Sequence, residues 1–132
     1  MNLTKDIKQH LVGCGITETI YRSRLPDDAP DEAVCLYEYA GQPLNQMDSA
    51  FAGLSLQVVV RDADFDAGLK RAQAISLLLR DIGNPDGAAP AMTIGDTLYH
   101  KITALQSPFK LKEDERGRIY FAQNFRVWAR SN

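Results

Sequence analysis

The chain has few cysteines, no long hydrophobic run and no large excess of one charge. Its 132 residues include two cysteines, Cys14 and Cys35, which are too few for a disulfide framework and too far apart for a local metal motif. We therefore expect two free thiols. No apolar stretch approaches the ~20 residues of a membrane-spanning helix, and the first residues lack the apolar segment of a signal peptide. These absences predict no membrane contact and a default location in the cytoplasm.

The balance of charge also limits the possible partners. The sequence has 15 Lys and Arg against 17 Asp and Glu, which gives a formal net charge of −2. Such a chain has no overall positive field to attract a polyanion, so tight binding to nucleic acid is not expected. The length suits one domain over residues 1–132, with a core that buries roughly two-thirds of the surface of the unfolded chain.

The clearest structural pattern runs from residue 54 to residue 82. Residues 54–61 alternate between apolar and polar side chains, which predicts a strand buried on one face. After an acidic turn, apolar residues recur every three or four positions from Phe65 to Ile82, which predicts an amphipathic helix. We expect this strand and this helix to cover each other and to hold most of the core.

The remaining elements are expected around this unit. Leu3, Ile7 and Leu11 predict a first helix, capped by Asn2 or Thr4. Further strands are expected at residues 16–25, 33–39, 97–105 and 118–130, whereas residues 92–95 have no clear assignment. The fold class is therefore α+β: a mixed, mostly antiparallel sheet of about four to five strands with two flanking helices.

The last predicted strand has the cleanest alternation in the chain, and only Gln123 breaks it. At about 3.3 Å per residue it would span some 40 Å, which is longer than one small sheet needs. An overhang that pairs between subunits is one explanation. One face of this strand would carry Arg118, Tyr120, Arg126, Trp128 and Arg130. These residue types suit single-stranded nucleic acid or a protein interface, and the acidic chain favours the protein interface.

The acidic turn is the nearest feature to a catalytic motif. Asp62, Asp64 and Asp66 follow an apolar strand, where carboxylates can hold Mg²⁺ or act as nucleophile and acid. The haloacid-dehalogenase phosphatases use such a pair, but they need a longer chain and further acidic and lysine motifs. A small Mg²⁺-dependent phosphohydrolase using Asp62 and Asp64 stays an alternative. The simpler interpretation is that Asp62 or Asp64 caps the helix, with no metal and no cofactor.

The ordered set of local motifs resembles the tail terminator, or minor capsid, family of long-tailed bacteriophages and prophages. The motifs are CLYEYAG at residues 35–41, LQVVVR at 56–61, AQAI at 72–75 and DERGRIYFAQNFRV at 114–127. A typical member has a glycine pair where this chain has Ala40 and Gly41. The resemblance covers most of residues 1–130.

The resemblance implies a virion structural protein and not an enzyme. A lambda-type terminator caps the tail tube, usually as a hexameric ring, stops tube polymerisation and presents a surface to head-completion proteins. DNA would pass through the ring without specific binding. The chain would act at the head–tail junction of the virion after assembly in the host cytoplasm. The expected contact regions are residues 41–53 and 112–118, and the candidate interface residues are Tyr37, Tyr39, Gln42, Pro43, Lys112, Glu113, Asp114, Arg116, Arg118, Tyr120, Arg126 and Trp128.

Overall fold

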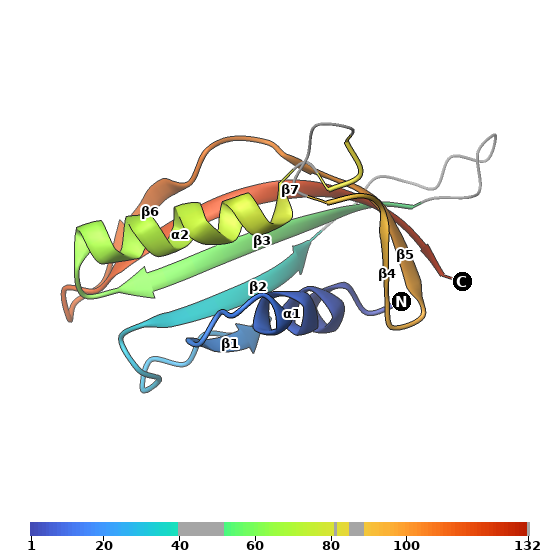
Figure 1. Cartoon of the computed structure of the whole chain (residues 1–132). Helices are drawn as coiled ribbons and strands as arrows, with labels where there is room; N and C mark the ends of the chain where they lie inside the picture. The colour runs from blue at the N-terminus through green and yellow to red at the C-terminus, as the bar shows by residue number, and fades with distance from the viewer. Residues whose placement is uncertain (40–51, 81, 85–88, 132) are drawn as a thin grey trace.

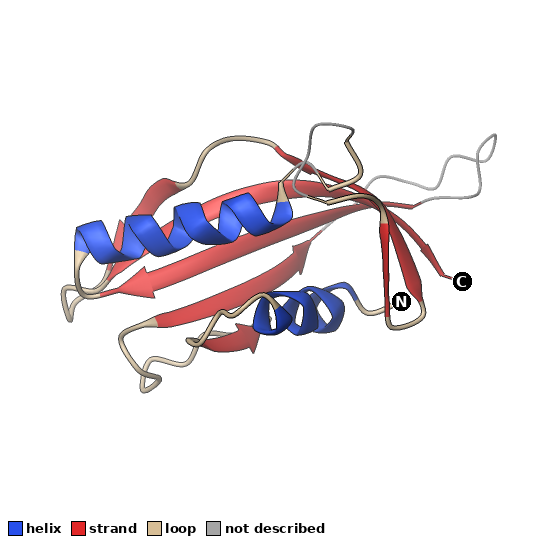
Figure 2. Ribbon diagram, in the orientation of Figure 1, coloured by secondary structure: helices blue, strands red, loops and turns tan. Residues whose placement is uncertain are grey.

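A curled, mixed sheet with two helices against one of its faces forms the described part of the chain (Figures 1 and 2). The computed structural model describes residues 1–39, 52–80, 82–84 and 89–131. The elements in chain order are α1 (Leu3–Gly13), β1 (Thr19–Arg22), β2 (Ala33–Tyr39), β3 (Ala52–Asp62), α2 (Phe65–Leu79), β4 (Met92–Ile94), β5 (Thr97–Ala104), β6 (Phe109–Glu113) and β7 (Ile119–Ser131).

The two longest strands, β3 and β7, lie side by side at the centre of the sheet. The strand order is β1-β2-β3-β7-β5-β4, and β6 also pairs with β7. The β1–β2 pair is parallel and the other pairs are antiparallel. β7 pairs with β3 along one edge, and with β6 and then β5 along the other. Partners within the chain therefore account for the whole length of β7, and no overhang is needed to explain it.

The predicted number of strands is wrong, although the α+β class is right. The described residues form seven strands, where the sequence predicted four to five. The additional strands are β4 and β6. β4 has only three residues, too few for an alternation to show. All five residues of β6 are exposed, and β6 runs straight into the charged turn, so its pattern is that of a solvated loop.

The helices begin where the sequence predicts. The Asn2 side chain caps α1 by accepting a hydrogen bond from the Lys5 N–H at 3.3 Å. α2 was expected to continue to residue 82, but Arg80 has an extended backbone and ends it. Ile82 is still buried, because the chain turns back along the sheet and the Ile82 carbonyl accepts a bond from the Ile102 N–H at 3.0 Å.

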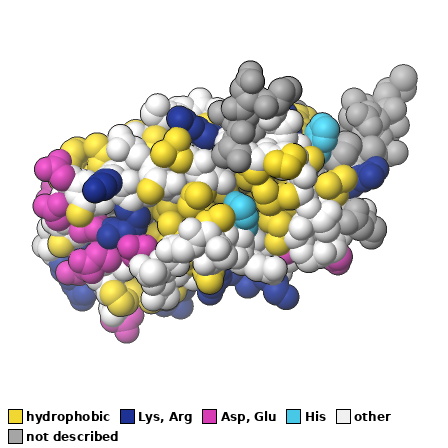
Figure 3. Space-filling model, in the orientation of Figure 1, with side chains coloured by type: hydrophobic (Ala, Val, Ile, Leu, Met, Phe, Trp, Pro, Cys, Tyr) yellow, Lys and Arg dark blue, Asp and Glu magenta, His cyan; other side chains and the backbone are white. Residues whose placement is uncertain are grey.

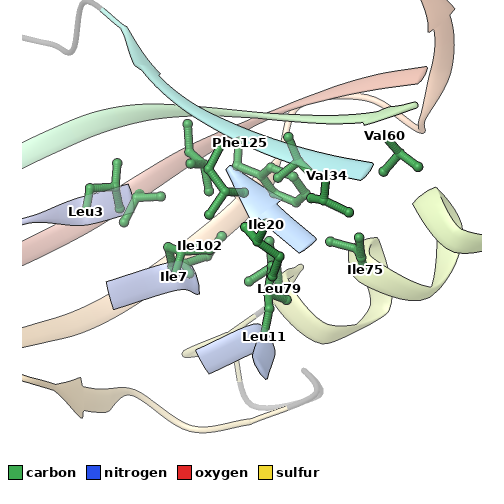
Figure 4. Close-up of a cluster of buried hydrophobic side chains, with 14 of the residues drawn as sticks. Leu3, Ile7, Leu11, Ile20, Val34, Val60, Ile75, Leu79, Ile102 and Phe125 are labelled. Atoms are coloured by element: carbon green, nitrogen blue, oxygen red, sulfur yellow. The ribbon is translucent and has the colours of Figure 1, made fainter. Parts of the chain in front are cut away.

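The core lies between the sheet and the two helices (Figure 4). α1 contributes Leu3, Ile7 and Leu11, and α2 contributes Ile75 and Leu79; all five side chains are buried. They meet the apolar face of the sheet, where every second residue of β2, β3 and β7 points inward, as the alternation predicts. The inward residues shown in Figure 4 include Ile20, Val34, Val60, Ile102 and Phe125.

Candidate assembly surfaces

The face of the sheet turned away from α1 and α2, called the open face below, carries six of the twelve candidate interface residues. The strand register aligns its side chains in rows, such as Tyr37, Gln57 and Asn124. Gln57 donates a hydrogen bond to Asn124 at 3.1 Å within this row. The residues of the open face on β2, β3, β5, β6 and β7 are Ala33, Cys35, Tyr37, Tyr39, Ser55, Gln57, Val59, Arg61, Leu98, Lys101, Thr103, Phe109, Lys112, Tyr120, Ala122, Asn124, Arg126, Trp128 and Arg130.

At one end of the open face a buried arginine holds down the loop between β1 and β2. Arg61 has no exposed surface, and its guanidinium donates to the carbonyl oxygens of Pro26, Ala29 and Pro30 at 2.9–3.1 Å. Its charge also lies 5.9 Å from the centre of the Tyr120 ring. Because three carbonyls accept from one rigid fork of donors, Arg61 fixes the path of this loop.

The turn between β6 and β7 forms a second polar centre at the same end. The Asp114 carboxylate accepts hydrogen bonds from the Arg116 and Arg118 N–H groups, the Arg118 Nε and the Tyr120 hydroxyl at 2.7–3.0 Å. Desolvation acts to raise the pKa of Asp114, but the bonds from Arg118, Tyr120 and Arg116 outweigh it and lower the pKa to about 2. The carboxylate therefore stays charged in water at ordinary pH.

Two arginines join these centres. Arg116 and Arg118 both donate to the carbonyl of Asp27, at 2.9 and 2.8 Å. Arg118 is almost fully buried, and its guanidinium lies 2.7 Å from Asp114 and 3.9 Å from Asp31. The loop between β1 and β2 is thus bound to both β3 and the β6–β7 turn, and we call Arg61, Arg116 and Arg118 the arginine anchor.

A small apolar cluster lies next to the arginine anchor. Val59, Tyr120 and Ala122 are buried there, with Leu25 and Tyr37 packed against them. Burial raises the pKa of Tyr37 to about 12, and the neighbouring Cys35 contributes to the shift. The cluster shows that the open face is partly covered at this end by the chain's own loop.

The other end of the open face is different in character. Arg126 and Trp128 are half-buried, and Tyr39 is exposed. Lys101 is aligned with Trp128 across the β5–β7 pair. The Arg126 Nε has no hydrogen-bond acceptor among the described residues. This end therefore presents basic and aromatic side chains outside the apolar cluster.

Gln123, the residue that interrupts the alternation of β7, holds the connection between β5 and β6. Its side chain is buried and donates to the Gln106 carbonyl at 2.7 Å, while the Gln106 side chain accepts from the Asn124 N–H at 2.9 Å. These reciprocal bonds lie where the partner of β7 changes from β5 to β6. Gln123 therefore fixes the connection between β5 and β6 at the point where β7 changes its partner strand.

The aspartates of the acidic turn have structural partners. Asp64 is the N-cap of α2 and accepts from the Ala67 N–H at 2.8 Å. Asp62 accepts from the Asp64 N–H at 2.9 Å and pairs with Arg71, which also lies 2.9 Å from Glu18. Among the described residues, no group of three or more His, Cys, Asp or Glu could hold a metal ion.

The structure separates the predicted interface residues into two groups. Arg118 and Tyr120 are buried against the chain's own loop, Arg116 donates to that loop, and Asp114 binds its neighbours in the turn. Lys112 lies over the Tyr120 ring at 4.6 Å and Glu113 pairs with Lys110 at 3.6 Å, both close to this end. Tyr39, Arg126 and Trp128 lie at the other end, and Tyr37 lies between the two. Gln42, Pro43 and most of the predicted contact loop, residues 41–51, lie outside the described residues.

The sequence analysis did not single out Arg61 or Gln123 for a role. Each has a signal that could have drawn attention. Arg61 is the only charged residue in the predicted strand 54–61, and Gln123 is the only polar residue among the inward positions of β7 from Ile119 to Ala129.

The fold is shared with a solved chain of a virion particle. A solved chain from the "virion of native gene transfer agent (GTA) particle" matches this structure with a TM-score of 0.72. The match covers 96% of this chain and 93% of that chain, at 15% sequence identity. At this identity the likeness establishes a shared fold. No curated protein matches the chain significantly in sequence.

The sequence itself places the chain within a family. Residues 10–129 match the family model described as bacteriophage tail terminator protein. The match spans nearly all of the chain, so the chain belongs to the bacteriophage tail terminator family, as the local motifs indicated. Its role is therefore that of a structural protein of a phage tail.

Proposed function

We propose that this chain caps the tail tube of a phage or prophage particle and stops its polymerisation. It would then form the tail-side surface of the head–tail junction. The observation that carries this proposal is the family match over residues 10–129, and the fold shared with a chain of a virion particle supports it. The work of such a protein is binding, and its residues act by forming contacts rather than by catalysis.

The proposed partners are further copies of the chain, the tail tube protein and a head-completion protein. The copies would form a ring, with six as the expected number, and DNA would pass through it without specific binding. The protein would assemble in the host cytoplasm and remain in the virion at the head–tail junction. Neither helix in the described part of the chain is long and apolar enough to cross a membrane.

Light scattering of the purified protein, alone and with tail tubes of the same phage, tests the association. We expect a particle near six times 14.7 kDa, free or bound at the ends of tubes. A protein that stays monomeric and never associates with tubes would overturn the proposal.

Tail length tests the capping itself. Particles assembled without the protein should have tubes of irregular and excessive length in electron micrographs. Adding the purified protein during assembly should restore a uniform length. Tubes of normal length in its absence would show that another component stops polymerisation.

A further inference from the structure

A groove lies between the C-terminal part of α2 and the connection from β5 to β6. It consists of two adjoining hollows, and Arg80, Ser107 and Pro108 line both of them. Leu77 and Leu105 lie on its two sides and are 55% and 49% exposed. Exposed apolar side chains that gather around one groove are typical of an interaction site. We call this feature the α2 groove.

The α2 groove offers one positive charge and several hydrogen-bond donors. Arg80 is exposed, and its side chain makes no hydrogen bond or ion pair within the described part of the chain. Gln106 and Ser107 supply further donors, and no Asp or Glu is among the described residues that line the groove. A guanidinium binds a carboxylate through two parallel N–H···O bonds. The groove therefore suits a carboxylate that lies next to an apolar side chain.

Both walls of the α2 groove are held in place by the chain itself. One wall is the helix. The other is the connection from β5 to β6, where the Leu105 N–H donates to the Asn124 carbonyl at 2.9 Å and Gln123 donates to the Gln106 carbonyl at 2.7 Å. A groove with fixed walls loses little conformational entropy when a partner binds.

The first turn of α2 carries a carboxylate next to an apolar ring. Phe65 is 44% exposed, although its ring also contacts Phe121 with 5.2 Å between the ring centres. The adjacent Asp66 is exposed and makes no hydrogen bond or ion pair within the described part of the chain. Figure 3 shows the helix side of the molecule, where acidic side chains gather at the end at which α2 begins.

This pair is distinctive among the exposed apolar side chains of the described residues. The other large one that has an acidic neighbour in the sequence is Tyr39, which follows Glu38. Successive residues of a strand point to opposite faces of the sheet, so Glu38 and Tyr39 cannot enter one groove together. Successive residues of a helix lie about 100° apart around its axis, so Phe65 and Asp66 can.

We propose that the first turn of α2 in one copy docks in the α2 groove of the next copy. The Asp66 carboxylate would bind Arg80, and the Phe65 ring would cover the apolar sides of the groove. The inference rests on the proposed function, because a ring needs a contact that passes from each copy to the next.

The two halves of this contact lie at opposite ends of one helix. At ~1.5 Å per residue, α2 separates Asp66 from Arg80 by roughly 20 Å, so the pair cannot form within one chain. A contact from the start of α2 to the end of α2 in the next copy runs head to tail. Such a contact is heterologous, and heterologous contacts close into rings when the rotation permits.

A phosphate group of nucleic acid is the alternative occupant of the α2 groove. It would bind Arg80 as well as a carboxylate does. It would, however, leave Leu77 and Leu105 in water, whereas a phenyl ring removes apolar surface from water on both sides of the contact. The exposed leucines therefore favour a protein partner.

Exchange of the two charges tests the contact. Arg80→Glu and Asp66→Arg each bring like charges together, and each should weaken self-association at least about tenfold. A chain with both substitutions has an opposite pair again and should associate, as should an equal mixture of the two single variants. Light scattering, with and without tail tubes of the same phage, measures the association.

Matched controls change the same charges outside the contact. Lys70→Glu lies on an exposed position of α2 and Asp28→Arg on an exposed loop, and both should leave association unchanged. Circular dichroism establishes that each variant is folded. Binding of a double-stranded oligonucleotide is measured in parallel.

A second variant tests the apolar part of the groove. Leu77→Ser should weaken association, whereas Val12→Ser on α1 should not. The two side chains are matched, because Leu77 is 55% exposed and Val12 is 54% exposed. Equal association of these two variants would overturn the docking of Phe65 in the groove.

Four further results would overturn the inference. If both charge variants associate like the unmodified protein, the contact lies elsewhere, although tube capping stands. If Arg80→Glu loses oligonucleotide binding but still associates, the groove binds phosphate. If association stops at two copies, the helix ends meet mutually and not head to tail. If the unmodified protein associates neither with itself nor with tubes and does not restore tube length, the proposed function fails together with the inference.

Discussion

The two faces of the sheet are stabilised in different ways. The helix-covered face buries apolar side chains from both helices and six strands, and its chief interactions are non-directional. The open face has a buried cluster of only three residues, and guanidinium groups bound to backbone carbonyls hold its covering loop. One face gives the fold its stability. The other gives a surface its shape and charge.

This difference shows how a small domain can present a charged surface without leaving it mobile. A guanidinium satisfied by three carbonyls in fixed directions positions a loop more sharply than apolar contact does. The cost is a buried positive charge, Arg61, whose Nε has no acceptor among the described residues. Such a charge stabilises the fold only while its remaining donors are paired.

The largest expected effect is a loss of stability when a core residue of the helix-covered face is truncated. Phe125→Ala removes a fully buried ring from the core and should lower the free energy of unfolding by about 3–5 kcal/mol. The half-buried Trp128, three residues along the same strand, is the matched control, and Trp128→Ala should cost about 1 kcal/mol or less. Urea denaturation measures both. Equal losses of unfolding free energy would show that packing on the open face stabilises the fold as much as packing on the helix-covered face does.

A smaller effect is expected from the arginine anchor. Arg61→Ala removes three hydrogen bonds from a charged donor and should cost about 2–3 kcal/mol. The Ala29 N–H, which bonds the Pro26 carbonyl at 3.2 Å, should also exchange faster with solvent. Arg126→Ala serves as the control on the same face and should leave Ala29 protected. Unchanged exchange in Arg61→Ala would show that the loop holds its own shape.

Much of the helix-covered face could be predicted from the sequence. Periodicity identified the inward residues Leu56, Val58 and Val60 and the buried residues of α1, because a single apolar core imposes a regular spacing on every element that contacts it. The acidic turn predicted a helix cap at Asp62 or Asp64, and Asp64 is the N-cap. The strands that lie outside this regularity were missed, since β4 is short and β6 buries none of its residues.

The open face could be predicted only in part. The alternation of β7 showed which residues share that face, but not that Arg118 and Tyr120 are buried while Trp128 is half-exposed. Their burial depends on a loop that is about 90 positions away in sequence and is held through backbone carbonyls. Because every residue has a backbone carbonyl, hydrogen bonds to carbonyls require no particular residue types in the loop. The sequence therefore gives no sign of them.

A third test concerns the polar pair within the helix-covered face. Tyr99 is fully buried and donates to the Asp6 carboxylate at 2.6 Å, which links β5 to α1. Burial and this bond to a charged acceptor raise the pKa of Tyr99. Tyr99→Phe leaves a buried carboxylate without that donor and should cost about 1–2 kcal/mol in urea denaturation. Tyr39→Phe, at an exposed hydroxyl, should have almost no effect. If Tyr99→Phe and Tyr39→Phe have equal effects on the free energy of unfolding, the bond from Tyr99 to Asp6 does not stabilise the protein, and α1 is held by its apolar residues alone.

The smallest expected effect is a pH dependence at the arginine anchor. The pKa of Asp114 falls from an ordinary value of 3.8 to about 2 in the folded protein, so the folded state favours the charged carboxylate. That contribution to stability is complete above pH 3.8 and is lost as the pH falls toward about 2. Asp114→Asn should therefore flatten the decline of stability over this range. Asp28→Asn is the control, because Asp28 makes no hydrogen bond or ion pair within the described part of the chain. If both variants decline as steeply as the unmodified protein, the acid sensitivity lies in other carboxylates, and the arginine anchor holds its loop without help from Asp114.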